Sequence, residues 1–373
     1  MRYLWYAMYG FVTTLAIYAL FFRPARVVES PPQEPTPPPA VVQEAPEADV
    51  QIALILDTSS SMDGLVAQAR AQIWEMVAEM QTDSNGNEKT VAVALYQYGN
   101  NRLAKSEGYI QQLTPLTTNL DEVTLKLHSL STTGGKEYAP LAISRAVEEL
   151  EWSDDDGVER LIVIAGNEGF SQGRLSPKDA LQAAERLDIR VMPIYCANRG
   201  ATRSAVSSWK YAAELANTDF QSIDPDQAIA QSESPYDKLI IEKYRKLEET
   251  RVYAAGSEVQ AARSKKAEGY LAPKAAVDRA VVNSRQAPSF DLVKQYKSGK
   301  SIAPTALPQA LRSKSKDEQV QYLEARSKAR ETLQREIEEL NQQRSAHLAQ
   351  KRNRRAGSAP ASLGSAFRNN VNK

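Results

Sequence analysis

The chain has 373 residues, with 46 Lys and Arg against 46 Asp and Glu, two histidines and one cysteine. This length accommodates one folded domain with appendages. Because the charges balance, the molecule has no net positive charge that would attract nucleic acid, so no nucleic-acid partner is expected. The lone Cys196 excludes an internal disulfide and a multi-cysteine metal site. The distant His128 and His347 do not predict a zinc site or a catalytic triad.

Residues 4–22 form an uncharged apolar run of 19 residues. A helix of this length would be roughly 28 Å long, close to the bilayer core of about 30 Å. We therefore predict an uncleaved single-pass anchor within residues 1–28 that holds the protein in the inner (cell) membrane. A cleaved signal peptide is the alternative, but the run exceeds the usual apolar length of about 7–15 residues and no A-x-A-like site closes it.

Residues 29–49 are rich in proline and glutamate, including three consecutive prolines at 37–39. Consecutive prolines favour an extended polyproline II conformation, and the acidic residues keep it solvated. We predict a linker that holds the body of the protein away from the membrane. A ligand for SH3-like domains is the alternative interpretation.

Residues 50–225 alternate strand-like with helix-like segments, a pattern typical of parallel βαβ units. We predict an α/β fold with a doubly wound, mostly parallel sheet of about six strands, in which Tyr109–Leu113 forms a short antiparallel edge. The strands are expected at Val50–Leu56, Val91–Tyr98, Tyr109–Leu113, Arg160–Ala165, Arg190–Tyr195 and Phe220–Ile223. The helices are expected at 66–80, 120–130, 140–150, 176–187 and 205–216.

Beyond residue 225 the strand signals stop, while Lys, Arg, Glu and Ala become frequent. We predict a helical extension at 226–300, a linker at 301–317, a long charged helix at 318–352 and a disordered basic tail at 353–373. Heptad spacing in the long helix puts Arg326, Arg330 and Arg344 on the apolar seam, so a parallel coiled coil has weak support. A solvated helix, or one that docks on a partner, fits this pattern better.

The first strand ends in a D-x-S-x-S motif formed by Asp57, Ser59 and Ser61. At the carboxyl end of a strand in an open α/β sheet, these side chains would lie in the ligand-binding crevice. Their oxygen atoms suit Mg²⁺, which takes octahedral oxygen ligands and keeps waters that a carboxylate can replace. The structural alternative is that the two serines cap the following helix while backbone amides hold Asp57.

This motif within such a sheet resembles the metal-ion-dependent adhesion site of von Willebrand factor type A domains, over about residues 50–225. The resemblance implies that Asp57, Ser59 and Ser61 ligate a divalent cation together with a threonine and an aspartate from two later loops. It also implies a free coordination position for an acidic side chain of a partner. The variant loops and the helical extension resemble a bacterial, membrane-anchored subset of type A proteins.

The first of the later loops departs from the family pattern, because Lys136 stands at the threonine position. Glu137, Thr132 or Thr133 would then have to supply the oxygen. The lysine ammonium would oppose a nearby cation, or would pair with Asp57 in its absence.

The second loop also departs from the pattern, because Gly166 stands at the aspartate position. Asn167 or Glu168 could substitute there only with a shifted backbone. The candidate metal ligands are accordingly Asp57, Ser59, Ser61 and Glu137.

The leading functional hypothesis is a non-enzymatic, membrane-anchored adhesion-type module that recognises an unidentified protein at this degenerate site with Mg²⁺. The proline-rich linker and the frequent use of type A domains outside the cytoplasm favour an extracytoplasmic, periplasmic body. One alternative is a passive domain whose C-terminal helices assemble an envelope complex. Another is a phosphatase-like hydrolase with Asp57 as nucleophile, which Ser59 disfavours because it stands where a second acid would be needed.

Overall fold

The computed structural model describes residues 46–83, 86–197, 200–227, 233–355 and 361–371. The predicted membrane helix at 4–22 and most of the proline-rich linker at 29–49 lie outside these residues. Within the described part, none of the helices combines the length and the apolar character needed to cross a bilayer.

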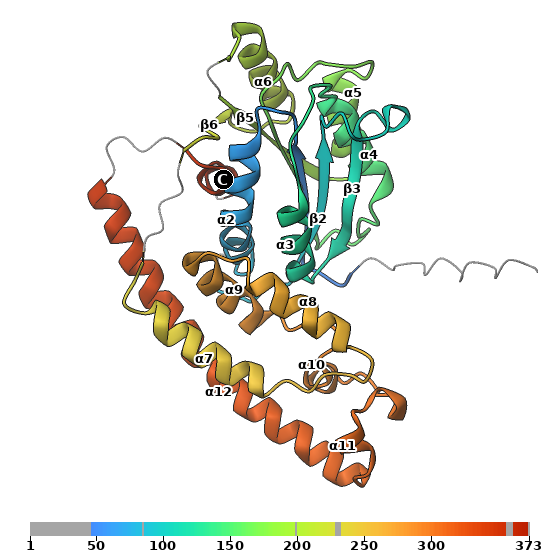
Figure 1. The fold of residues 1–373 in the computed structure, drawn as a ribbon, viewed down its shortest axis with the longest axis vertical. Helices are drawn as coiled ribbons and strands as arrows, with labels where there is room; N and C mark the ends of the chain where they lie inside the picture. Colours follow the sequence, from blue (N-terminus) through green and yellow to red (C-terminus); the bar gives the residue numbers. More distant parts are fainter. Residues whose placement is uncertain (1–45, 84–85, 198–199, 228–232, 356–360, 372–373) are drawn as a thin grey trace, which may run out of the picture. The chain divides into compact units, whose positions relative to one another are not determined.

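A six-stranded sheet with the order β3-β2-β1-β4-β5-β6 organises the first half of the described chain (Figure 1). Its strands are β1 Val50–Asp57, β2 Val91–Tyr98, β3 Ile110–Thr117, β4 Glu159–Gly166, β5 Ile189–Cys196 and β6 Gln221–Ile223. All neighbouring strands pair in parallel except β2 and β3, which are antiparallel. The predicted mostly parallel α/β sheet with an antiparallel edge is confirmed, although β3 runs further than predicted.

Helices cover both faces of the sheet, which explains why its central strands are apolar almost throughout. They are α2 Asp63–Met80 and α3 Leu120–Ser129 on one face, and α4 Ala139–Glu149, α5 Pro177–Glu185 and α6 Arg203–Leu215 on the other. Because side chains alternate along a strand, Leu54 and Leu56 of β1 pack under α2, whereas Ala53 and Ile55 pack under α4.

The remainder of the described chain is helical. It comprises α7 Asp237–Glu249, α8 Glu258–Glu268, α9 Pro273–Arg285, α10 Leu292–Lys297, α11 Gln309–Arg312, α12 Lys316–Arg355 and α13 Leu363–Val371, with short 3₁₀ turns at Lys105–Glu107 and Pro304–Ala306. Helices α9 and α13 pack against α2 (Figure 1), and their Val282 and Phe367 are buried in the same core cluster as Leu54. The extension therefore completes the core of the sheet domain.

One buried and one partly buried ion pair reinforce this attachment. The Arg279 guanidinium of α9 makes two contacts with the Asp121 carboxylate of α3, at 2.7 and 3.0 Å. Lys274 of α9 lies 2.8 Å from Glu75 of α2. Since ionised groups are rarely buried without a partner, these pairs fix which surfaces of the two parts meet.

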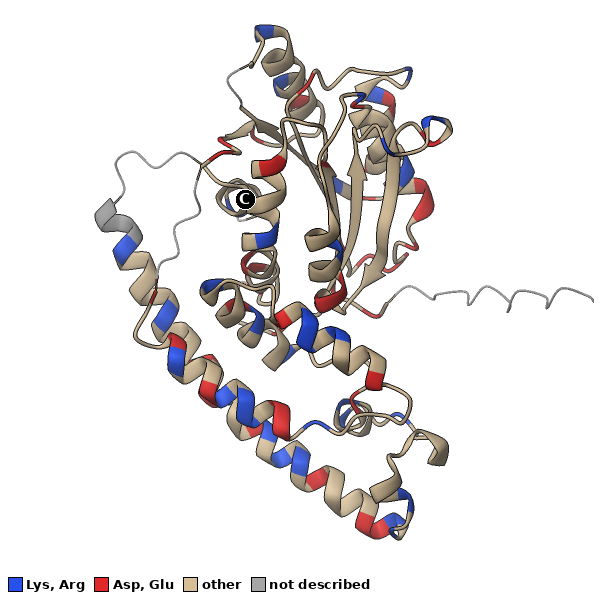
Figure 2. Cartoon of the chain, in the orientation of Figure 1, with Lys and Arg blue, Asp and Glu red and all other residues tan. Residues whose placement is uncertain are grey.

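The sequence favoured a solvated helix or one that docks on a partner for α12, with weak support for a coiled coil, whereas the helix packs on α7, α9 and α10 of its own chain. Figure 2 shows basic and acidic residues interspersed along α7 and α12. Arg330 and Arg344, two of the arginines on the predicted apolar seam, are buried. Arg330 lies 2.7 Å from Asp291, and Arg344 lies 2.9 Å from both Asp237 and Asp278. Acidic partners that are distant in sequence satisfy them, so sequence spacing alone could not reveal this packing.

The prediction of a disordered tail at 353–373 is wrong for the segment that forms α13. Leu363 and Phe367 are fully buried against α2. The amide groups that begin α13 are also satisfied, since Leu363 N–H donates to Gln68 Oε1 at 2.9 Å and Gly364 N–H donates to Gln72 Oε1 at 3.1 Å. The segment's Gly, Ser and Asn content concealed the helical spacing of its few apolar residues.

Candidate functional site

Asp57 is the last residue of β1, and it lies between the carboxyl ends of β2 and β4. In the sheet, β2 neighbours β1 on one side and β4 neighbours it on the other. The direction in which successive strands are added to the sheet therefore reverses at β1. Ligands of open α/β sheets bind in the crevice that such a reversal creates. The fold thus puts Asp57 where the sequence predicted it.

The Asp57 side chain is fully buried and only partly satisfied. Its Oδ1 accepts a hydrogen bond of 2.7 Å from the Ser59 N–H, whereas its Oδ2 has no hydrogen-bond partner. Burial raises the pKa of Asp57 to about 7, while the hydrogen bond from the Ser59 backbone N–H opposes that increase and the negative charge of Glu168 adds to it.

Glu137 comes from the loop between α3 and α4 and is 4% exposed. A Cβ atom on Gly99 would lie 2.8 Å from Glu137 Cγ and 2.9 Å from Asp57 Oδ1, so both acids crowd the same glycine. Burial and the nearby charge of Asp57 raise the pKa of Glu137 to about 8. Two carboxyl groups thus share one desolvated crevice.

Four buried oxygen atoms around this crevice have no hydrogen-bond partner. They are Asp57 Oδ2, Ser59 Oγ, Glu137 Oε2 and Asn167 Oδ1. Because buried polar atoms are nearly always hydrogen-bonded, so many in one place indicate an oxygen-rich site suited to a hard cation. Within the described ranges, no three His, Cys, Asp or Glu side chains could hold a metal ion, so a cation here also needs hydroxyl and amide oxygens.

Ser61 is exposed at the edge of the crevice. Its Oγ accepts a hydrogen bond of 2.8 Å from Asn167 Nδ2, which links the loop after β1 to the loop after β4. The residue before α2 is Met62, and no side chain caps that helix. The alternative in which Ser59 and Ser61 serve as helix caps is therefore wrong.

Of the three oxygen donors expected from this loop, Glu137 is buried, whereas Thr132 and Thr133 are half-buried. Lys136 is exposed and forms a backbone bridge with Gly99, while the next residue, Glu137, is buried. Thr132 Oγ1 donates instead to Asp63 Oδ1 at 2.5 Å. The expected opposition between Lys136 and a cation is therefore not built into the crevice.

Sequence reasoning missed Tyr98, which shapes the β4 side of the site. The Tyr98 side chain is fully buried, and its hydroxyl donates to Ala165 C=O at 3.3 Å. Its hydroxyl oxygen also occupies the position that a Cβ atom on Gly166 would take. A possible signal was the run Tyr96–Asn100, in which Gly99, with φ of 81°, directly follows a buried strand.

Comparison with known proteins gives one family match. Residues 51–208 match the family model described as von Willebrand factor type A domain, a range that includes Asp57, Glu137 and Asn167. No curated protein matches the chain.

Several solved structures are similar to part of the chain. The conserved hypothetical protein BatB from Bacteroides thetaiotaomicron is 16% identical, with coverage of 47% of this chain and 90% of that one and a TM-score of 0.35. An aerotolerance-related membrane protein from Bacteroides fragilis NCTC 9343 is 15% identical, with coverage of 48% and 93% and a TM-score of 0.34. Proximal thread matrix protein 1 from the mussel byssus, with a zinc-occupied MIDAS motif, is 13% identical, with coverage of 48% and 42% and a TM-score of 0.36.

Proposed function

Residues 51–208 are a von Willebrand factor type A domain, and on that premise we propose that this protein is a membrane-anchored module that binds another protein at the crevice around Asp57. Domains of this family are generally interaction modules rather than enzymes, and they can bind a metal ion at the adhesion site. We propose Mg²⁺ as the ion and an acidic side chain of the partner as the group that it recognises.

The observation that carries the proposal is the set of unsatisfied buried oxygen atoms. Asp57, Ser59, Glu137 and Asn167 would hold the cation, and Asn167 also positions Ser61. The ion would supply a positive charge at an otherwise acidic crevice, which allows a partner carboxylate to approach.

The charge of the site also supports this proposal. The family pattern combines two aspartates with neutral hydroxyl ligands, whereas this chain lacks the second aspartate at Gly166. Glu137 supplies a carboxylate from the other loop, so the crevice again contains two ligand carboxylates. The number of negative charges around the cation is therefore maintained although their positions differ.

Membrane attachment and location are further parts of the proposal. The apolar residues 4–22 would anchor the chain in the bilayer, and residues 29–49 would space the domain from it. We place the body on the extracytoplasmic side. Protease treatment of spheroplasts tests this placement, because digestion of the body is expected only if it lies outside the cytoplasm.

Metal binding is tested by unfolding the detergent-solubilised full chain with EDTA or with Mg²⁺. At a free Mg²⁺ concentration of roughly 100 times Kd, the free energy of unfolding should rise by about 2.7 kcal/mol. The variants Asp57→Asn and Glu137→Gln should lose this response, whereas Lys136→Thr should keep it because Lys136 is exposed. A wild-type protein with no Mg²⁺ response would refute the metal assignment.

Partner recognition is tested by cross-linking in cells that express the full chain or Asp57→Ala. Loss of the cross-linked partner in the variant and after chelation supports recognition at the crevice. Retention in both supports the scaffold alternative, in which the C-terminal helices assemble an envelope complex. Removal of the extension is unsuitable for this comparison, because α9 and α13 belong to the core of the domain.

A further inference from the structure

A second candidate binding site lies within the helical extension, in a cavity of about 270 Å³ where α10 and α12 meet the end of α9. It shares no lining residue with the crevice around Asp57, so its role is independent of the metal proposal. Four cationic and two acidic side chains line it: Arg285, Lys294, Lys297, Arg330, Glu88 and Glu331.

Arg330 of α12 brings a buried donor group to this cavity. Its side chain is 7% exposed. The Nε atom donates to Thr250 Oγ1 at 3.1 Å and Nη1 donates to Asp291 Oδ2 at 2.7 Å, whereas Nη2 has no hydrogen-bond partner in the described part of the chain. Because buried donors are nearly always hydrogen-bonded, this guanidinium is suited to one further acceptor.

Lys294 of α10 adds a half-buried ammonium group. Its Nζ donates to Ala287 C=O at 3.0 Å, which leaves two of its three N–H bonds for other acceptors. No acidic side chain among the described residues forms an ion pair with it. Burial lowers the pKa of Lys294, and the charge of Asp291 opposes this only in part. A bound anion would therefore stabilise the charged form.

The balance of charge in the walls favours a monovalent anion. The exposed Glu88 forms no ion pair within the described ranges, and Lys294 is the remaining unmatched cation. A carboxylate carries one negative charge and two acceptor oxygens, which matches one unmatched cation and two donor groups. The other lining cations already have acidic partners, which are Glu338 for Arg285, Glu331 for Lys297 and Asp291 for Arg330.

The rest of the wall suits the short carbon chain of such a ligand. Val293 and Ala287 are buried apolar residues that line the cavity. Ser327 lies three residues before Arg330 on α12 and therefore on the same face of that helix. Its hydroxyl makes no hydrogen bond within the described part, so it provides a further donor.

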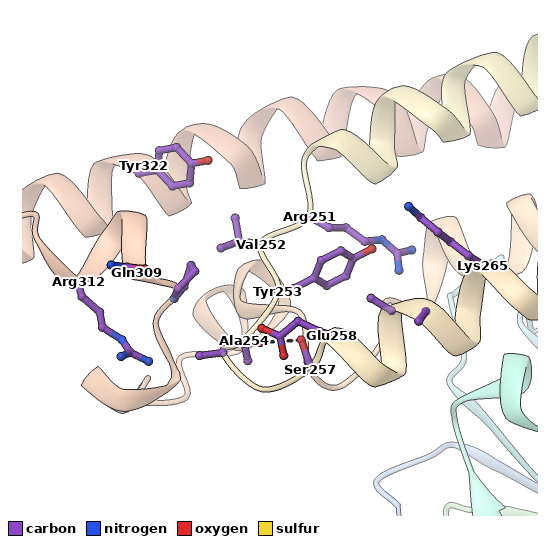
Figure 3. Close-up of a pocket in the computed structure, with 14 residues that line it drawn as sticks. Arg251, Val252, Tyr253, Ala254, Ser257, Glu258, Lys265, Gln309, Arg312 and Tyr322 are labelled. Atoms are coloured by element: carbon purple, nitrogen blue, oxygen red, sulfur yellow. Dashed lines mark hydrogen bonds between the residues drawn. The ribbon is translucent and has the colours of Figure 1, made fainter.

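A larger cavity, of about 900 Å³, lacks this combination. It opens between α8, the region of α11 and the chain segment that follows α7 (Figure 3). Its buried cation, Arg251, lies 2.8 Å from Glu248, and its other cations, Lys265 and Arg312, are exposed to solvent. A half-buried cation without an acidic partner therefore distinguishes the smaller cavity.

We propose that the cavity between α10 and α12 binds the carboxylate group of a short aliphatic acid. Lys294 Nζ and Arg330 Nη2 donate to its oxygen atoms, and its carbon chain lies against Val293. Hydrogen bonds between ionised groups are stronger than those between neutral ones. The site therefore selects the charged acid over a neutral molecule of the same shape.

The test is isothermal titration calorimetry of the detergent-solubilised full chain at constant ionic strength. A chelating resin first removes divalent cations, so that the crevice around Asp57 cannot bind the ligand through a metal ion. Propionate should bind with a Kd on the order of 1 mM, which is within reach of a ligand with about five heavy atoms. Propionamide, which has the same shape without the charge, should bind at least about tenfold more weakly.

Substitutions of single charges test the position of the ligand. Lys294→Gln should weaken propionate binding at least about tenfold. Lys265→Gln is the matched control, because Lys265 lines the larger cavity of Figure 3, and it should leave Kd unchanged. Glu88→Gln should tighten binding by about two- to fivefold, since it removes a negative charge from the wall.

A second pair of variants keeps the test decisive if circular dichroism shows that Lys294→Gln is unfolded. Ser327→Asp places a carboxylate of the chain itself in the cavity, so it should abolish propionate binding. Thr332→Asp changes an exposed residue of the same helix that does not line the cavity, so it should keep binding.

Four outcomes overturn the proposal. No binding of propionate up to about 20 mM excludes the site. Equal binding of propionate and propionamide excludes recognition of the charge. An unchanged Kd in folded Lys294→Gln or in Ser327→Asp places the ligand elsewhere. Tighter binding of inorganic phosphate than of propionate assigns the cavity to a polyvalent anion in place of a carboxylate.

Discussion

The Tyr98 hydroxyl oxygen occupies the space that a side chain at Gly166 would need. A Cβ atom at Gly166 would overlap that oxygen and would also lie 3.2 Å from Asp57 Oδ2. Tyr98 is a buried residue of β2, and its hydroxyl is hydrogen-bonded to Ala165 C=O of β4, so it cannot move aside without breaking this contact. Tyr98 thus fills the space in which an aspartate side chain would lie, and the next residue along the chain, Asn167, is hydrogen-bonded to Ser61.

The first prediction concerns this contact. Gly166→Ala should lower the free energy of unfolding by about 1–3 kcal/mol through overpacking, and the loss should be smaller when Tyr98→Phe removes the hydroxyl. A double-mutant cycle from urea unfolding should give a coupling of at least about 0.5 kcal/mol. Gly169→Ala is the control, because its Cβ atom would meet no atom closer than 4.0 Å. Additive effects of the two substitutions would show that the hydroxyl does not restrict position 166.

The sequence was sufficient to locate the main acid of the site but not to choose its partners. Asp57 could be placed because an apolar strand that ends in an acid and hydroxyl residues has few other interpretations. The choice among Glu137, Thr132 and Thr133 depended on which side chain of the loop turns inward, and the loop backbone determines that. Tyr98 was missed because its effect acts through space on Gly166, far along the chain.

The second prediction is that stability without divalent cations falls as pH rises through neutrality. Asp57 and Glu137 have pKa values of about 7 and about 8 in the folded state, above their ordinary values of 3.8 and 4.5. The folded state therefore binds more protons than the unfolded state between about pH 4 and 8, so the free energy of unfolding decreases with pH in that window. The slope approaches about 1.4 kcal/mol per pH unit for each proton that differs.

Urea unfolding in EDTA at several pH values measures this slope. Glu137→Gln should reduce it by about one proton, because glutamine keeps the shape but does not titrate. Glu151→Gln, an exposed acid in another loop, should leave it unchanged. Stability that increases from pH 5 to pH 8 would contradict the arrangement of two buried acids.

The third prediction concerns the junction between the domain and its extension. Asp121→Ala removes the carboxylate that accepts two hydrogen bonds from the buried Arg279 guanidinium. The free energy of unfolding measured in urea should therefore fall by about 3–5 kcal/mol. Glu122→Ala, whose carboxylate lies 4.0 Å from the exposed Arg263, should cost less than about 1 kcal/mol. Equal effects would show that the Arg279 pair does not hold the two parts together.

The helical extension shows why sequence patterns can identify elements but miss their packing. Helical periodicity correctly predicted a long charged helix in the region of α12. The burial of Arg330 and Arg344 could not follow from that periodicity, because it depends on Asp291, Asp237 and Asp278 from other segments. An isolated helix with arginines on its seam is a poor candidate for burial, whereas one with matched acids is a good one.

The fourth prediction tests whether α13 belongs to the core. Phe367→Ala removes a fully buried ring from the cluster shared with α2 and β1, so it should lower the free energy of unfolding by about 3–5 kcal/mol. Asn369→Ala on the exposed side of the same helix should change it by less than about 0.5 kcal/mol. Both variants should unfold in one transition, because the cluster joins α13 to the sheet. If Phe367→Ala unfolds like the wild type, the tail does not contribute to the core, and the domain is complete without it.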